Sequence, residues 1–326
     1  MFSHKDIDCR TVFVINCIRK RGLRVCNGEL LLEEQVENSD KTKTLTKLPF
    51  QKILALFVIG NIQITTPLIE KCKRFGVALV VMKASFRPVF YWANDAEANF
   101  ILHKRQYAFD SEDISVAKIL MENKLINQRK ALLDTRSKDE LTLKAIDTID
   151  RSLSSIQEVS DYSSLLGIEG NAAKIYFSAF FQGESWKQRQ PRTKCDAINA
   201  TLDIGYYMLF NFIECYLRMF GFDIYIGVYH RTWFKRKSLV CDIMEPFRPI
   251  IDKAVRTGWH RKQFSEKDFH IQKGEYRLKH EKNSDYCHVF FDALIPYKSD
   301  TFKYVQSYYR CFMGCKSVKF YPSFLL

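Results

Sequence analysis

The spacing of apolar residues changes near residue 95, and this change constrains the fold more than any other feature. Before it, apolar residues form short, partly β-branched runs between polar or turn-forming segments. After it, they recur at three- and four-residue steps, the spacing of one helix face. The sequence therefore predicts an α+β protein with a small β-rich domain at residues 1–95 and a larger, mostly α-helical domain at residues 96–326. No flexible linker is visible, so we expect the two domains to pack closely.

The expected elements follow from these two patterns. In the first domain, β-type runs occupy Thr11–Cys17, Leu23–Cys26, Glu29–Val36, Ile53–Val58 and Val77–Met82. One helix is expected at Ile64–Phe75, with Thr65 or Thr66 as its cap and Gly76 after its last turn. In the second domain, helical patterns cover Ala96–Tyr107, Ile114–Leu133, Leu141–Val159, Leu165–Phe181 and Cys195–Arg218. A capping box at residues 137–140 is expected to start the third of these helices.

The segment Ser238–Asp252 is the strongest candidate for part of a functional site. Its charged residues recur at three- and four-residue steps and so share one helix face: Asp242, Glu245, Arg248 and Asp252. Apolar residues opposite them would anchor the helix in a core, and two prolines predict a kink or a late helix start. The alternative is a solvated helix face that carries a single Glu245–Arg248 ion pair.

Glu169 is a second candidate, within the expected helix Leu165–Phe181. It shares a face with apolar residues such as Ala172 and Tyr176. A carboxylate inside an apolar stripe is costly unless it is paired or binds a metal. The alternative is a glutamate at a helix edge that reaches water.

His230 follows an apolar stretch and lies twelve residues before Asp242. A lone histidine more often has a structural role, but residues 231–262 hold nine Lys or Arg and only three acids. Acids concentrated among basic residues are typical of a metal site for phosphoryl chemistry, because Glu, Asp and His hold the cation while basic residues hold phosphates.

The balance of charge indicates a polyanionic partner. The chain has 50 Lys and Arg against 37 Asp and Glu, a formal net charge of +13, and nucleic acid is the simplest partner for such a protein. The loop Trp186–Lys194 supplies Lys187, Arg189 and Arg192 beside an aromatic residue, which suits contacts with a phosphate backbone. An equally simple interpretation is a solvated loop.

Several other classes of protein are disfavoured. The ten cysteines include no Cys-x-x-Cys pair, so neither a zinc ribbon nor a thioredoxin-like motif is supported. The chain does not open with a secretory signal, and its longest apolar runs are too short to span a bilayer. We therefore expect a cytoplasmic protein that has no contact with a membrane.

Several short motifs, taken in order, resemble one known family. In the second domain these are Leu-Leu-Gly-Ile-Glu169-Gly, Asp196-x-x-Asn199, Gly227-x-x-His230 and Asp242-x-x-Glu245-Pro-Phe-Arg248-Pro, and earlier matches are Gly60-Asn61-x-x-Ile64 and Lys124-x-x-Asn127-Gln128. In this order and spacing they resemble the CRISPR spacer-acquisition integrase, the first adaptation protein of CRISPR loci ("Cas one"). The likeness covers nearly the whole chain but is looser after Gly258. Ile224 stands where the family often has a proline.

The resemblance implies a site and a reaction. It implies that Glu169, His230 and Glu245 bind Mg²⁺ or Mn²⁺, with Asp242 as a further catalytic acid nearby. The implied reaction joins the 3′-OH ends of short double-stranded DNA fragments to a CRISPR repeat by transesterification. Water in place of the hydroxyl would give endonuclease activity. Candidates for contacts with DNA are Lys187, Arg189, Arg192, Arg231, Lys235 and Arg248.

The resemblance also implies partners, and other functions stay open. It implies a homodimer formed through the β domains and bridged to a second dimer by the small, ferredoxin-like second adaptation protein. A stand-alone metal-dependent DNA nuclease or a transposon-type integrase could use the same residues. A non-catalytic DNA-binding subunit is disfavoured because all three expected ligands are present, and RNA binding lacks an aromatic-rich signature.

Overall fold

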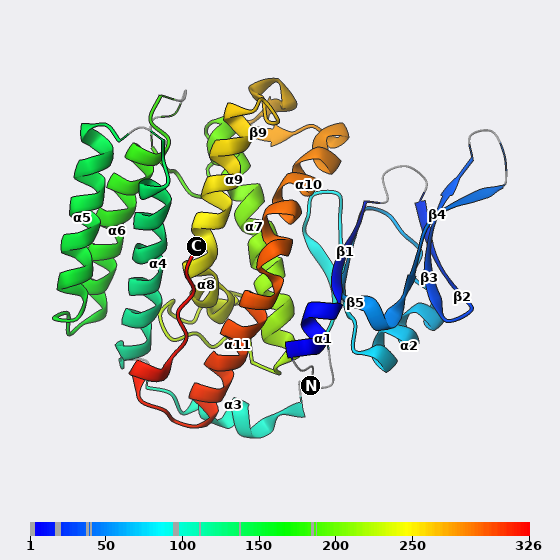
Figure 1. Ribbon diagram of the computed structural model, residues 1–326, viewed down its shortest axis with the longest axis horizontal. Coiled ribbons are helices and arrows are strands. Elements are labelled where there is room, and N and C mark those ends of the chain that lie inside the picture. Colours follow the sequence, from blue (N-terminus) through cyan, green and yellow to red (C-terminus); the bar gives the residue numbers. More distant parts are fainter. Residues whose placement is uncertain are drawn as a thin grey trace.

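The computed structural model describes residues 4–16, 21–36, 39, 41–93, 98–110, 112–136, 138–183, 186 and 188–326. Strands dominate the first third of the described chain and helices the rest, so the predicted α+β class is confirmed. Figure 1 shows the strands β1 to β5 on one side of the molecule and the long helices on the other. The predicted boundary between residues 95 and 96 lies outside the described residues.

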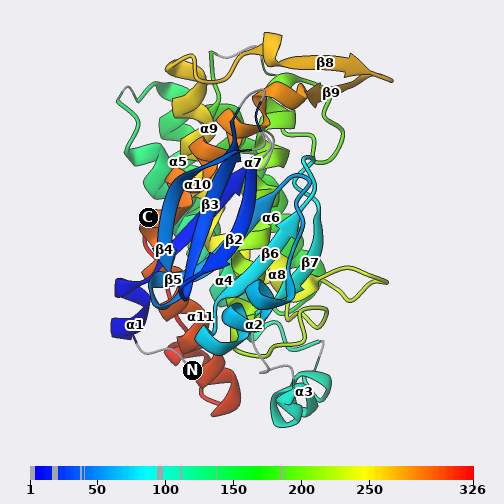
Figure 2. The same cartoon turned by 90° about the vertical axis from the view of Figure 1, so that its right-hand side faces the viewer.

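Two sheets form the β-rich part of the molecule. The four-stranded sheet has the order β1 (Thr11–Asn16), β5 (Ile53–Ile59), β6 (Ala78–Met82), β7 (Pro88–Trp92). Its first three strands are parallel and β7 is antiparallel to β6. The other sheet is antiparallel and consists of β2 (Arg21–Cys26), β3 (Glu29–Gln35) and β4 (Thr42–Pro49). Figure 2 shows this sheet in front of the four-stranded one.

The four-stranded sheet is covered on both faces. In β5 every residue is buried: Leu56 and Val58 pack with the three-stranded sheet and helix α2 (Thr66–Phe75), whereas Phe57 and Ile59 belong to the core of the helical part. A continuous apolar run is expected for a central strand covered on both sides. The sheet and the helices therefore share one core.

The local signals in the β-rich part are partly confirmed. Asn27 and Gly28 both have positive φ, 49° and 80°, as a two-residue hairpin turn between β2 and β3 requires. Gly76 ends α2 in the left-handed conformation, with φ of 66°. The expected threonine cap is not formed by a side chain, although Thr65 occupies the N-cap position. The elements missed by the sequence analysis here are α1 (His4–Cys9), β4 and β7.

Helices build the rest of the described chain. In order they are α3 (Phe100–Tyr107), α4 (Ser115–Leu133), α5 (Glu140–Ile156), α6 (Tyr162–Phe180), α7 (Ala197–Met219), α8 (Ser238–Met244), α9 (Arg248–His260), α10 (Asn283–Leu294) and α11 (Lys298–Met313). A short hairpin, β8 (Phe269–Gln272) and β9 (Glu275–Leu278), follows α9. Figure 1 shows α4, α5 and α6 side by side at the edge, and α7 beside α9 in the middle.

Helix starts follow simple capping chemistry. Asp139 caps α5, because its carboxylate accepts a hydrogen bond from the backbone N–H of Thr142 at 2.8 Å. The capping box expected at residues 137–140 is therefore replaced by an aspartate cap, and Ser137 lies outside the described residues. Asp196 caps α7 in the same way, through the N–H of Asn199 at 2.6 Å.

Among the described residues, none of the helices combines the length and the apolar character that a membrane span requires.

Candidate metal centre

The segment Ser238–Asp252 forms two helices joined by a tight turn. α8 ends at Met244, one 3₁₀ turn covers Glu245–Phe247, and α9 starts at Arg248. The prolines at 246 and 249 explain the break, because neither has the N–H that continues an α-helix. The predicted kink is confirmed. The carbonyl of Pro246 instead accepts a hydrogen bond from Asn127 of α4 at 2.9 Å.

The acidic residues of this segment are buried and connected. Asp242, Glu245 and Asp252 are at most 1% exposed, so the alternative of a solvated helix face is wrong. Their side chains belong to one row of pairwise contacts, in which His230 and Tyr206 also take part. The row runs from Asp242 to His230, Glu245, Arg248, Tyr206 and Asp252.

Asp242 fixes the loop that carries His230. Three consecutive backbone N–H groups, those of Val228, Tyr229 and His230, donate to its carboxylate at 2.6, 3.1 and 2.8 Å. Gly227 makes this approach possible, because a Cβ there would lie 2.4 Å from Oδ2 of Asp242. The imidazole Nδ1 of His230 also lies 2.7 Å from Oδ1 of Asp242. With Nδ1 held by a carboxylate, Nε2 is the ring nitrogen left to bind a ligand.

Lys124 of α4 lies between the other two predicted metal ligands. Its Nζ is 2.6 Å from Oε1 of Glu169 in α6 and 2.7 Å from Oε2 of Glu245. Its side chain is 7% exposed, so the ammonium is almost entirely removed from water. Tyr229 donates its hydroxyl to the second oxygen of Glu169. Nε2 of His230 lies 4.0 Å from Oε1 of Glu245, so the three predicted ligands do come together.

Ion pairing outweighs burial in this cluster. Burial alone would raise the pKa of Glu245, but Arg248, Lys124 and His230 lower it to about 2. Burial likewise opposes ionisation of Glu169, and Lys124 overcomes it, so the pKa of Glu169 is also lowered. The pKa of Lys124 is raised, because the two glutamates outweigh its own burial. Both carboxylates are therefore ionised at neutral pH.

The donor set fits a divalent cation. Among the described residues, no three His, Cys, Asp or Glu side chains already form a complete metal cage. The reason is visible in the geometry, because Lys124 holds one oxygen of Glu169 and one of Glu245. Two carboxylates plus one imidazole nitrogen suit Mg²⁺ or Mn²⁺. A cation bound there would take over oxygens that the ammonium of Lys124 now occupies.

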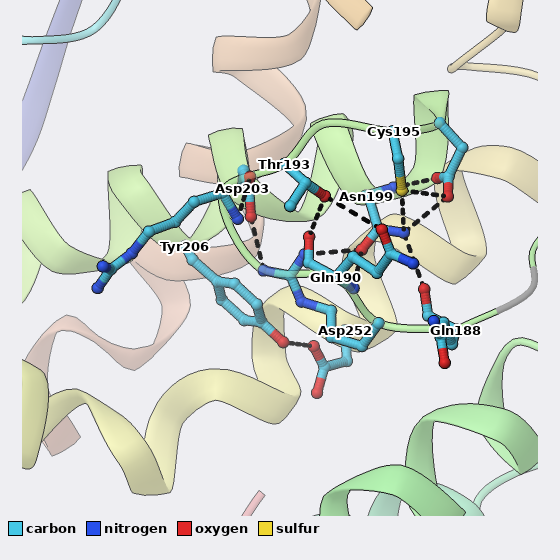
Figure 3. A network of polar contacts seen from close by, with 11 residues as sticks. Gln188, Gln190, Thr193, Cys195, Asn199, Asp203, Tyr206 and Asp252 are labelled. Carbon is cyan, nitrogen blue, oxygen red and sulfur yellow. Dashed lines mark hydrogen bonds and ion pairs between the residues drawn. The ribbon is translucent and has the colours of Figure 1, made fainter. Parts of the chain in front are cut away.

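A second polar network supports the site from the side of Arg248. Tyr206 donates its hydroxyl to buried Asp252, which also accepts from Tyr176 at 3.0 Å. The guanidinium groups of Arg189 and Arg248 lie over the Tyr206 ring, at 5.4 and 4.7 Å from its centre. Figure 3 shows Tyr206 beside Asp252, with the loop before α7 gathered around Asn199. Burial raises the pKa of Asp252 to about 6 despite these hydrogen bonds.

Some of the predicted DNA-contact side chains are bound within the protein, and others are exposed to solvent. Arg189 binds Asp203 at 2.6 Å and Asn199 at 2.8 Å, so its guanidinium is engaged within the protein. Arg192 donates only its backbone N–H to Asp203, at 3.1 Å, and its residue is exposed. Arg231 and Lys235 are exposed too, next to His230. Lys187 lies outside the described residues, and Arg248 is paired with Glu245 at 2.9 Å.

Sequence reasoning missed residues that complete the site. Lys124 was noticed only for its resemblance to a family motif, and Tyr229 and Tyr206 were given no role in the site. For Lys124 a signal did exist, because a lysine inside the apolar pattern of a long helix must find an acid when it is buried. Tyr206 gave no such signal, because its pairing with Asp252 depends on packing between α7 and α9.

Comparisons with known proteins agree on one family. Residues 22–290 match the family of CRISPR associated protein Cas1. "CRISPR-associated endonuclease Cas1 1" of Thermodesulfovibrio yellowstonii is 29% identical over 241 residues, which cover 70% of this chain and 76% of the relative.

Two solved structures share the fold. A casposase bound to its integration product has a TM-score of 0.73 at 19% identity, covering 94% of this chain and 92% of that one. A chain of a partial Cas6-RT-Cas1–Cas2 complex has a TM-score of 0.71 at 20% identity, with 97% and 98% covered. At this identity the structures show the fold alone, whereas the family match extends over most of the sequence. The chain belongs to the family of CRISPR associated protein Cas1.

Proposed function

We propose that this chain is a divalent-metal-dependent DNA integrase that joins the 3′-OH end of a short DNA fragment to a CRISPR repeat, with an associated endonuclease activity. The observation that supports this most is the convergence of Glu169, His230 and Glu245 from three separate elements in a basic protein. These residues would hold Mg²⁺ or Mn²⁺. The relative from Thermodesulfovibrio yellowstonii is named an endonuclease, and the casposase was solved with an integration product.

Each group of this chain has a distinct task in the proposed reaction. Bound at this centre, a divalent cation would lower the pKa of the attacking hydroxyl and stabilise the negative charge that builds up on the phosphate. Asp242 orients His230, and Arg248 pairs with Glu245 and so fixes its carboxylate. The 3′-oxygen forms a new bond to phosphorus, the old P–O bond of the repeat breaks, and the hydroxyl's proton passes to the departing oxygen through solvent. The number of phosphodiester bonds is conserved.

We infer the partners from the same arrangement. The family neighbour solved with Cas2 supports a second adaptation protein as a partner of this chain. The edge of the four-stranded sheet supports a homodimer formed through the β-rich domain, because β7 is an outer strand and exposes Val89 and Phe90, at 56% and 42%. Phe90→Asp, followed by analytical ultracentrifugation, tests this contact. An unchanged dimer would place the interface elsewhere.

A strand-transfer assay tests the proposed function. Labelled short DNA with either a 3′-OH or a 3′-dideoxy end is incubated with a supercoiled plasmid that carries a CRISPR repeat, in Mn²⁺ or in EDTA. We expect label to join the plasmid only with the 3′-OH and with metal, and His230→Ala to abolish the joining. His270→Ala, which replaces an exposed histidine of β8, is the matched control.

The other outcomes decide between the alternatives. Metal-dependent nicking without transfer of label would favour a stand-alone nuclease. Transfer into plasmids with and without a repeat would favour a transposon-type integrase. If His230→Ala and wild type behave alike, the metal centre has been assigned to the wrong residues.

A further inference from the structure

The loop between His230 and α8 exposes two neighbouring aromatic residues. Trp233 and Phe234 are 75% and 82% exposed, and all residues from 231 to 235 are exposed. A single exposed aromatic residue is ordinary, but adjacent Trp and Phe side chains at such exposure place a large apolar surface in water. Such surface is typical of a binding site.

This loop is held at both ends, so its exposed tip has a defined shape. At its start, Asp242 binds the backbone and the ring of His230. At its end, Lys237 binds both oxygens of buried Glu214 at 2.7 Å. Between them, the N–H of Arg236 donates to the carbonyl of Trp233 at 2.9 Å, closing a turn. Figure 2 shows the yellow-green segment that leads into α8 extending outward from the body of the molecule.

The charge around the aromatic pair indicates the kind of ligand. Arg231 and Lys235 flank it and are exposed, Arg236 and Lys237 follow in the sequence, and no Asp or Glu occurs from residue 224 to residue 241. A surface built for a protein partner is usually depleted in lysine at its centre. Cationic side chains interleaved with aromatic rings are instead the arrangement that binds single-stranded nucleic acid, because cations hold phosphates and rings stack on bases.

The tip is also close to the metal centre. Trp233 is three residues from His230, so their Cα atoms are at most about 11 Å apart. A row of rings joins the centre to the first turn of α6: His230 lies 5.1 Å from Tyr229, and Tyr229 lies 5.5 Å from Tyr162. The guanidinium of Arg231 covers Tyr162 at 4.9 Å. The first few nucleotides of a strand whose end is at His230 can therefore reach the aromatic pair.

We propose that Trp233 and Phe234 form a stacking site for unpaired bases of the DNA strand whose end occupies the metal centre. This inference rests on the proposed function, because it takes DNA as the ligand of that centre. Stacking ignores base identity, so the site selects unpaired over paired ends and not one sequence over another. Arg231 and Lys235 contribute contacts to the phosphates of the same strand.

Equilibrium binding without metal tests the proposal. Three DNAs are compared in EDTA, which prevents any reaction: a blunt duplex, the same duplex with a 3′ single-stranded end, and that end with abasic sugars that keep every phosphate. We expect wild type to bind the base-containing end about tenfold more tightly than the abasic one. Trp233→Ala/Phe234→Ala should bind both equally, and Trp233→Phe should keep most of the preference. Quenching of tryptophan emission by the base-containing end should be lost in Trp233→Phe.

Phe320→Ala is the matched control. Phe320 is another exposed aromatic residue with a lysine over its ring, Lys319 at 5.2 Å, as Lys235 lies over Phe234 at 5.0 Å. This control should bind like wild type. A double variant that keeps the base preference overturns the proposal, as does a wild type that has none. If the variant keeps the preference but loses a protein partner or self-association, the loop is a protein interface.

The test separates this inference from the proposed chemistry. Base-dependent binding through Trp233 and Phe234, with no metal-dependent cutting or joining of strands, would contradict the integrase proposal and support the stacking site. If wild type binds the abasic and the base-containing ends equally, and the double variant transfers strands as wild type does, the stacking site is wrong and the integrase proposal stands.

Discussion

The imidazole of His230 is held by the fully buried carboxylate of Asp242, with 2.7 Å between Nδ1 and Oδ1. The same carboxylate accepts three backbone N–H groups of the loop that carries the histidine. An acid behind a histidine fixes its ring and leaves the other nitrogen for the ligand. We therefore assign Asp242 a positioning role rather than direct contact with the metal.

Asp242→Asn should weaken metal binding without removing a ligand. The amide has one acceptor oxygen instead of two, so some backbone N–H groups and Nδ1 lose their partner. Loss of such a supporting contact typically costs about 10–100-fold in metal affinity, which a Mn²⁺ titration followed by electron paramagnetic resonance can measure. Asp223→Asn, in the same stretch of chain, is the control. Equal Mn²⁺ affinity in both variants would show that Asp242 does not orient the histidine.

Lys124→Met should destabilise the metal-free protein and increase its stabilisation by metal. Removing one member of a buried ion pair costs about 3–5 kcal/mol, because the charges left behind are unpaired. Here Glu169 would lose its cationic partner, and Glu245 would keep only Arg248. Mn²⁺ should then raise the melting temperature of the variant by more than it raises that of wild type, as measured by calorimetry.

The control for this change lies on the same helix. Lys130 pairs with Asp134 at the surface, where such pairs contribute about 0–1 kcal/mol. Lys130→Met should therefore leave stability nearly unchanged. If Lys124→Met is no less stable than Lys130→Met, the ammonium does not hold the two glutamates together.

Asp252→Asn should change the pH dependence of stability. Burial raises the pKa of Asp252 from 3.8 to about 6, so the folded state binds this proton more tightly than the unfolded state. Wild type therefore loses stability through this group as pH rises from about 4 to about 6. Over that interval the variant should gain up to about 3 kcal/mol relative to wild type, measured by urea unfolding. A constant difference between them from pH 4 to pH 7 would contradict the assignment.

Arg189→Ala and Arg192→Ala should affect different properties. Arg189 is bound to Asp203 and Asn199 and covers Tyr206, so its loss should lower stability and leave the salt dependence of DNA binding unchanged. Arg192 is exposed, and if it contacts one phosphate, its loss reduces the slope of log K against log salt by about 0.9. Fluorescence anisotropy measures the slope of log K against log salt for both variants. A reduced slope for Arg189→Ala would show that Arg189 contacts DNA.

The sequence patterns were sufficient where burial or helix capping dictates the residue types. The apolar run of β5 and the helix α2, which Gly76 ends, could be assigned because their surroundings demand those residues. β4 was missed because it lies mostly exposed, so its apolar residues do not alternate. β7 was missed because it is a short outer strand that begins at a proline.

The site shows the same limit. Glu169 could be proposed because a carboxylate within an apolar stripe needs a partner, and Glu245 because it shares a helix face with other charged residues. His230 was singled out by its basic surroundings, and the family resemblance alone joined the three as ligands of one metal. The identity of that partner depends on which helix lies opposite, and the contact between Lys124 and both glutamates joins residues 45 and 121 positions apart. Spacing along one segment carries no information on such a contact. The spacing showed the four members of the row that lie between Asp242 and Asp252, whereas it did not show the places of His230 and Tyr206 among them.

The hydrogen bonds that Asn127 forms on α4 have a consequence for variation in this protein. Besides the carbonyl of Pro246, Asn127 binds the backbone carbonyl of Phe324 at 2.9 Å and the N–H of Leu326 at 3.0 Å, and the Phe324 ring stacks on Phe247. Residues 324–326 thus join the helix of Lys124 to the turn of Glu245. Apart from the Phe324 ring, these contacts use backbone atoms alone. Replacement of the exposed Leu325 side chain should cost little, whereas a deletion of residues 324–326 would reach the metal centre.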